Sequence, residues 1–124
     1  MSVFRILLSI LAVIHALFAG FTALVGAFAN GGETWERLLV VLLHPLGAAG
    51  VLVLVLAPRL PRIANLAIAA VLLVVVTADL VLAQRIAAGA VKGDWELALV
   101  FSVVPVIGIV YAMSLLGTAR ATDE

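Results

Sequence analysis

The chain has 124 residues, 66% of them hydrophobic, and its 7 basic and 7 acidic side chains balance to a formal net charge of zero. The mean hydropathy of +1.36 is far above that of soluble domains, in which about half of the residues are apolar. A soluble domain is therefore excluded, the balanced charge gives no support to nucleic-acid binding, and the absence of cysteine excludes disulfides and thiolate metal sites.

Four apolar stretches are long enough to cross a bilayer, which takes about 20 residues of helix. They cover about residues 3 to 29, 36 to 57, 63 to 86 and 95 to 117, and only short connections lie between them. We therefore predict an all-α membrane protein whose single domain, residues 1–124, is a four-transmembrane-helix bundle. Its function must lie among these helices or at their ends, in contact with the lipid bilayer.

The first stretch carries small side chains on more than one face. In lipid, where no hydrophobic effect draws helices together, small residues allow close van der Waals contact between them. This pattern predicts contacts within the bundle and with another subunit, and so a homo-oligomer or a larger membrane complex. The small residues form two series, Ala12, Ala16 and Gly20, and Ala19, Ala23 and Ala27.

The second stretch begins with a pattern that returns in the fourth at an offset of sixty residues. The pattern pairs Trp35, Glu36 and Pro45 with Trp95, Glu96 and Pro105. Tryptophan is typical of the membrane interface, so Trp35 and Trp95 are predicted anchors. An interior proline removes an amide donor from its helix, so Pro45 and Pro105 predict kinks at equal depth. The repeat predicts two parallel-related helical hairpins.

The short connections predict the orientation through their Lys and Arg residues. More of these residues fall on the side of the two chain termini than on the opposite side, which favours cytoplasmic termini. The first group is Arg5, Arg59, Arg62 and Arg120, and the second is Arg37, Arg85 and Lys92.

Three ionisable side chains lie well inside the apolar stretches, where burial is costly and such groups mark functional candidates. At a rise of about 1.5 Å per residue, His15, His44 and Asp79 lie roughly 15, 20 and 24 Å from the predicted cytoplasmic ends of their helices. His44 and Asp79 belong to neighbouring helices and can meet. Such a pair either fixes the helices by a structural hydrogen bond or takes part in a proton relay or ion coupling.

The two histidines also allow a cofactor hypothesis. Two facing helices with histidines at similar depth can hold haem b between neutral imidazole ligands, and small residues that follow each histidine leave room for a macrocycle. His15 and His44 are the candidate ligands. At the offset of sixty they correspond to Val75 and Val104, so a cofactor site would belong to one half only. No metal site is predicted.

In length and span number the chain is similar to small multidrug-resistance transporters, but the membrane-embedded glutamate of that family is absent from the first stretch, which has only His15 in that region. It is similar in size to small fluoride channels and lacks their glycine-rich and polar filter motifs. The Ala-Gly end of the first stretch and His44-Pro45-Leu46-Gly47 resemble uncharacterised small four-helix bacterial inner-membrane proteins. This resemblance implies a fold and a bacterial inner membrane, with no activity to inherit.

These observations predict a protein that is not an enzyme, since no nucleophile beside a base, phosphate loop or pair of carboxylates is visible. The first hypothesis is an accessory, packing or assembly component of a homo-oligomer or larger membrane complex. The second is a haem b or quinone-linked electron-transfer subunit that uses His15 and His44. The third is a small-solute or proton-coupled transporter that uses His44 and Asp79.

Overall fold

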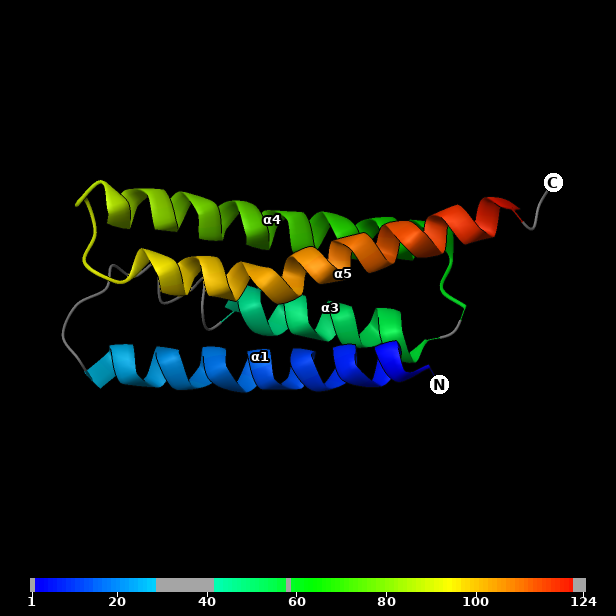
Figure 1. Cartoon of the computed structure of the whole chain (residues 1–124), viewed down its shortest axis with the longest axis horizontal. Coiled ribbons are helices and arrows are strands. Elements are labelled where there is room, and N and C mark those ends of the chain that lie inside the picture. The colour runs from blue at the N-terminus through cyan, green and yellow to red at the C-terminus, as the bar shows by residue number, and fades with distance from the viewer. Residues whose placement is uncertain (1, 29–41, 58, 122–124) are drawn as a thin grey trace.

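A computed structural model describes residues 2–28, 42–57 and 59–121. These residues form four α-helices that lie side by side (Figure 1). The helices are α1 (Val3–Phe28), α3 (His44–Leu56), α4 (Arg62–Ala87) and α5 (Trp95–Ala121). The prediction of an all-helical protein is therefore confirmed.

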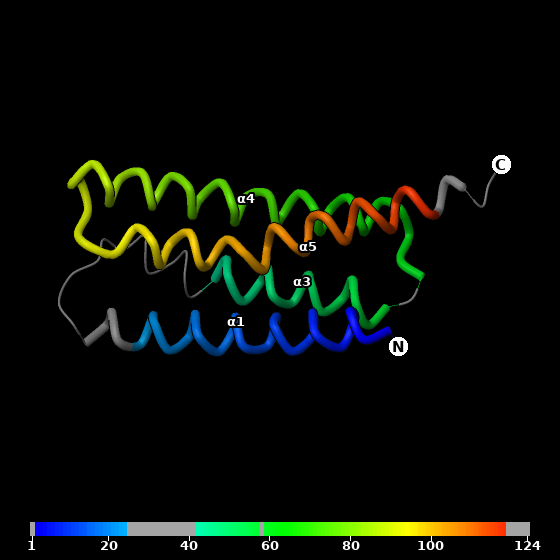
Figure 2. Tube along the Cα trace, in the orientation of Figure 1, coloured from blue at the N-terminus to red at the C-terminus, as the bar shows by residue number. Residues whose placement is uncertain are grey.

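The helices are arranged with α3 at the centre of the bundle. It packs against each of the other three, while the most extensive contacts join α4 to α5 and α1 to α3. The trace in Figure 2 places the N-terminus, the α3–α4 connection and the C-terminal end of α5 at one end of the bundle. The connection from α4 to α5 lies at the opposite end.

Three of the helices are long and apolar enough to cross a membrane. These segments are Val3–Leu24, Arg62–Ala87 and Trp95–Thr118. They match the first, third and fourth predicted stretches, whereas α3 has 13 residues and is shorter than a span requires. Trp35 and the beginning of the predicted second span, 36 to 41, lie outside the described residues, so the four-span bundle is shown only in part.

The core is aliphatic and lies where α1, α3, α4 and α5 meet. It contains Leu8, Ala12, Val51, Leu54, Val55, Leu72, Val104 and Ala112. Large apolar side chains also cover much of the outer surface, including Leu17 at 69% exposed and Val110 at 65% exposed. An apolar exterior around an apolar core is suited to lipid rather than to water.

One glycine is required by the close approach of α5 to α3 and α4. A Cβ atom at Gly108 would lie 2.7 Å from Val51 Cγ2 and 2.8 Å from Leu72 Cδ1. At Gly20, by contrast, a Cβ atom would meet no atom within 4 Å. Ala12 and Ala19 are fully buried. Some of the small residues that suggested contact with another subunit therefore serve packing inside the bundle.

The ends of α4 and α5 follow from local chemistry. Gly89 adopts a left-handed φ of 74° after α4, its amide donates to Ile86 O, and the Ala90 amide donates to Arg85 O. This pair of bonds is a Schellman motif, for which glycine is suited. At the start of α5, Asp94 Oδ1 accepts a hydrogen bond from the Glu96 amide at 3.0 Å.

The two prolines occupy different local structures. Pro105 is buried inside α5, which changes direction near its middle (Figure 1). Pro45 lies in the first turn of α3, and Leu42 and Leu43 precede it in a wider, π-type turn. A proline without an amide donor favours such a widened turn. The helix interior predicted before Leu42 lies outside the described residues.

A buried histidine–histidine–aspartate chain

Three helices each place one polar side chain in the core, within hydrogen-bond distance of the next. His15 lies on the buried face of α1 between Ala12 and Ala19. His44 is the first residue of α3, directly after the widened turn. Asp79 lies on the buried face of α4, one turn after Val75.

These side chains form a continuous hydrogen-bonded chain. His15 Nε2 lies 3.0 Å from His44 Nδ1. His44 Nε2 lies 2.9 Å from Asp79 Oδ1. Both ring nitrogens of His44 are thus engaged, so this imidazole bridges the other two groups. The predicted meeting of His44 and Asp79 is confirmed, and His15 is added to it.

The three hydrogen-bonded side chains are almost completely buried. The exposed fraction is 6% for His15 and 1% for both His44 and Asp79, which makes His15 the more accessible end. Buried polar groups need hydrogen-bond partners. Asp79 Oδ2 is buried and has none among the described residues, so one carboxyl oxygen is left open for a further donor.

The two short contacts hold one proton each and therefore permit two arrangements. In the first, His15 Nε2–H donates to His44 Nδ1, and His44 Nε2–H donates to an ionised Asp79. In the second, a protonated Asp79 donates to His44 Nε2, and His44 Nδ1–H donates to His15 Nε2, with the His15 proton on Nδ1. Each bond fixes the tautomer of its histidine. The second arrangement contains one proton more than the first, because Asp79 is protonated in the second and ionised in the first.

Aromatic rings cover the chain from the side of α5. The Phe101 ring centroid lies 4.8 Å from that of His44 and 5.6 Å from that of His15, in an edge-on contact with the latter. Phe18 of α1 stacks on the other side of Phe101 at 5.2 Å. Phe101 is 5% exposed and replaces water beside both imidazoles.

Phe101 is a site residue that the sequence reasoning did not single out. It lies one helical turn before Pro105, and its carbonyl is the one that this proline leaves without an amide partner. That spacing is the signal that links the predicted kink to the histidines. A side chain near a helix distortion is placed differently from one in a regular helix, and such distortions are frequent at functional sites.

The geometry does not fit haem ligation by His15 and His44. Their nitrogens face each other at hydrogen-bond distance, and the ring centroids are 4.9 Å apart. An iron atom and its macrocycle have no room between rings in direct contact. Nor does the part of the chain that the structure describes contain a group of three His, Cys, Asp or Glu side chains suited to a metal ion.

No protein family, curated protein or solved structure matches this chain. The evidence for function therefore comes from the buried group of His15, His44 and Asp79.

Proposed function

We propose that the protein is a proton-coupled membrane protein in which His15, His44 and Asp79 form an intramembrane proton relay. The observation that supports this is the unbroken hydrogen-bonded chain of three titratable side chains, from α1 through α3 to α4. Histidine and carboxylate chains inside membrane helices are the usual material of proton relays. This is the transporter hypothesis, extended from the His44–Asp79 pair to include His15.

The forward proton transfers along this chain need no movement of the side-chain heavy atoms. When a proton binds His15 Nδ1, the Nε2 proton of His15 moves to His44 Nδ1, and the Nε2 proton of His44 moves to Asp79 Oδ1. These transfers convert the first hydrogen-bond arrangement into the second. Rotation of the Asp79 carboxyl group then turns its O–H toward the place where Oδ2 stood, where the proton passes to an acceptor and Asp79 becomes ionised again. The cycle closes when each imidazole, by ring rotation and proton exchange with its neighbours, again carries its proton on Nε2.

The relay passes between helices, from α1 through α3 to α4, rather than along one helix. It therefore transfers protons between two access routes instead of forming a continuous pore. His15 is the entry closer to the surface, and the open Oδ2 atom of Asp79 is the opposite end. Phe101 keeps bulk water from bypassing the imidazoles, so proton transfer stays tied to the relay.

The membrane setting in this proposal is a bacterial inner membrane with both termini in the cytoplasm. Three helices that can cross a membrane support the integral location. The beginning of α1 and the end of α5 lie at one end of the bundle, together with Arg5, Arg59 and Arg62, and such positive residues favour the cytoplasmic side.

The duplicated hairpin is part of the same proposal. At the offset of sixty, Ala12, His15 and Ala19 of α1 correspond to Leu72, Val75 and Asp79 of α4. All six of these residues are buried. The same pattern of buried positions would thus occur in both helices. The polar residue is His15 in α1 and Asp79 in α4, and the two lie one helical turn apart in that pattern.

The test is proton flux into liposomes that contain the purified protein. A potassium diffusion potential drives protons, and an enclosed pH dye reports them. The wild type is expected to acidify the lumen faster than empty liposomes, and Asp79→Asn to abolish the difference. The matched control is Asp94→Asn, which changes an exposed carboxylate in the α4–α5 connection. Equal flux for wild type and Asp79→Asn would exclude the relay.

A second candidate function is the accessory or assembly component of a homo-oligomer or larger membrane complex. The observation that favours it is Gly20, an exposed glycine on the outer face of α1 with open space beside it. A partner helix can approach closely at such a position. Native mass spectrometry in mild detergent should then find an assembly that Gly20→Leu disrupts. A wild-type protein that is monomeric throughout would contradict this candidate.

A further inference from the structure

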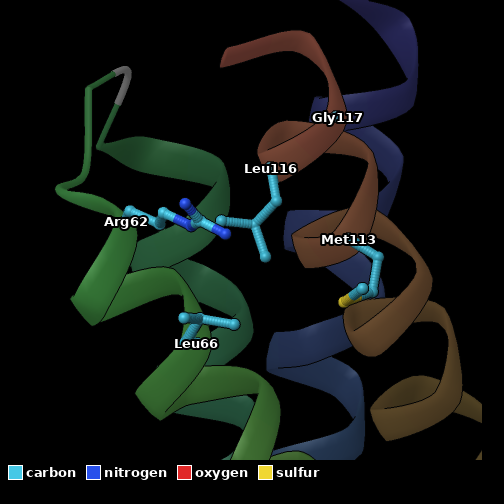
Figure 3. A pocket seen from close by; sticks show the side chains of 5 residues that line it. All are labelled: Arg62, Leu66, Met113, Leu116 and Gly117. Atoms are coloured by element: carbon cyan, nitrogen blue, oxygen red, sulfur yellow. The ribbon is translucent and has the colours of Figure 1, made fainter. Parts of the chain in front are cut away.

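A pocket of about 300 Å³ opens between the beginning of α4 and the last turns of α5. It is lined by Arg62, Leu66, Met113, Leu116 and Gly117. Figure 3 shows the Arg62 side chain extending from α4 toward Leu116 of α5. A Cβ atom at Gly117 would meet no atom within 4 Å, so this glycine adds open space to the pocket. The lining therefore combines one guanidinium with apolar walls.

The guanidinium of Arg62 has no hydrogen bond or ion pair with the described residues. Arg5, at the same end of the bundle, is engaged: its Nε donates to Val55 O at 2.8 Å, and its Nη2 donates to the same carbonyl. The acidic side chains among the described residues are Asp79 in the core and Asp94 and Glu96 at the other end. Within the described part of the chain, nothing neutralises Arg62.

The backbone beneath Arg62 also favours an anion. Arg62 is the first residue of α4, which has no side-chain cap and no acidic residue in its first turn. The positive end of the helix dipole is thus uncompensated there. Guanidinium groups bind phosphate by paired hydrogen bonds and are suited to it.

The depth of the pocket decides which anion fits. Arg62 begins a segment that can cross the membrane, and Gly117 lies one residue before the end of another. The charged side of the pocket therefore lies at headgroup level, while Leu66, Met113 and Leu116 face the first part of the hydrocarbon. A free phosphate ion would not use the apolar walls.

We propose that this pocket binds an anionic phospholipid, with the phosphate on Arg62 and the start of an acyl chain against Leu66, Met113 and Leu116. Basic pockets between membrane helices are a recognised form of lipid recognition. This site is separate from the proton relay and does not depend on it.

The test is native mass spectrometry of the full-length protein with equimolar phosphatidylglycerol and phosphatidylcholine. The wild type is expected to retain one phosphatidylglycerol molecule in preference to phosphatidylcholine. Arg62→Gln should reduce that preference by about tenfold, since it removes a charged hydrogen bond. Arg59→Gln is the matched control, because Arg59 is exposed in the α3–α4 connection and does not line the pocket.

A second pair of variants tests the apolar part. Gly117→Leu fills the pocket and should reduce retention of the lipid. Val110→Leu is the control, because it adds bulk at an exposed position of α5 outside the pocket and should not reduce retention. Inorganic phosphate added in excess should fail to displace the lipid. Displacement by phosphate, equal retention of the two lipids, or equal effects of Arg62→Gln and Arg59→Gln would each overturn the proposal.

The acidic C-terminal residues Asp123 and Glu124 are an alternative occupant. If these residues fill the site, the wild-type protein shows no lipid preference, and the double variant Asp123→Asn/Glu124→Gln acquires one. That result would also overturn the phospholipid proposal.

Discussion

The bundle contains two helix pairs, α1–α3 and α4–α5, and their sequences can be compared at an offset of sixty residues. The two pairs carry different residues at the positions of the buried polar side chains. In the α1–α3 pair, His15 and His44 meet through a hydrogen bond. Their counterparts in the α4–α5 pair, Val75 and Val104, are buried aliphatic residues. The second pair contributes Asp79 instead, at the position that Ala19 holds in the first. The polar chain therefore begins within the first pair and reaches the second pair through Asp79.

The largest loss of stability is expected when a single histidine of the α1–α3 pair is replaced by its counterpart from the α4–α5 pair. His44→Val removes the bridging imidazole and leaves His15 and Asp79 buried without their partner. Breaking a buried pair in this way costs about 3–5 kcal/mol of stability. Reversible unfolding in mixed micelles with rising detergent denaturant measures the loss.

The matched control replaces the whole chain. The triple variant His15→Val/His44→Val/Asp79→Ala leaves no orphaned polar group, so it should recover most of the stability lost in His44→Val while remaining without proton flux. A triple variant as unstable as His44→Val would contradict the view that the polar chain is separable from the frame.

The next effect concerns the frame alone. Gly108→Ala forces a methyl group to within 3 Å of Val51 and Leu72, so α5 must shift. Overpacking of this kind costs about 1–3 kcal/mol. Gly20→Ala, at a position with open space, should not lower the unfolding midpoint, since alanine favours the helix over glycine. Equal midpoints for the two variants would show that α5 does not approach α3 as described.

A smaller effect is expected at the ring that covers the chain. Phe101→Leu keeps an apolar residue but removes the aromatic cover beside His15 and His44. The rate at which diethyl pyrocarbonate modifies the histidines should rise several-fold. Phe18→Leu is the control, since Phe18 is 41% exposed and stacks on Phe101 rather than on the His44 ring. Equal rates for wild type and Phe101→Leu would remove Phe101 from the site.

The smallest effect is expected at a helix end. Asp94→Ala removes the acceptor for the Glu96 amide and should cost about 1 kcal/mol. Proton flux should not change, because Asp94 lies at the end of the bundle. A loss of flux in this variant would show that the relay extends beyond His15, His44 and Asp79.

The sequence predicted the helices well because membrane length and apolar composition leave few alternatives. The bounds of α1, α4 and α5 differ from the predicted stretches by a few residues at most. It predicted the contact between His44 and Asp79 because both lie at similar depth in consecutive helices. It did not predict that His15 joins them, because counting residues gives the depth of a side chain but not which helix it faces.

The haem hypothesis shows what depth alone leaves open. Equal depth allows two histidines either to face each other across a cofactor or to touch, and only the separation of α1 and α3 distinguishes these cases. Ala12 and Ala19, on either side of His15 along the buried face of α1, are fully buried and allow α1 to approach α3. Gly47, which the haem hypothesis uses as room for a macrocycle, faces Leu72 and Val75 of α4 instead. The wider turn before Pro45, which places His44, also depends on tertiary packing.

The most direct test of the buried chain is nitrogen NMR of the protein labelled with ¹⁵N-histidine in bilayers. We predict a scalar coupling across the hydrogen bond between His15 Nε2 and His44 Nδ1, and its disappearance in His15→Val. The coupling should persist in Asp94→Asn. Two imidazoles with independent signals and no coupling under any condition of protonation would contradict the account.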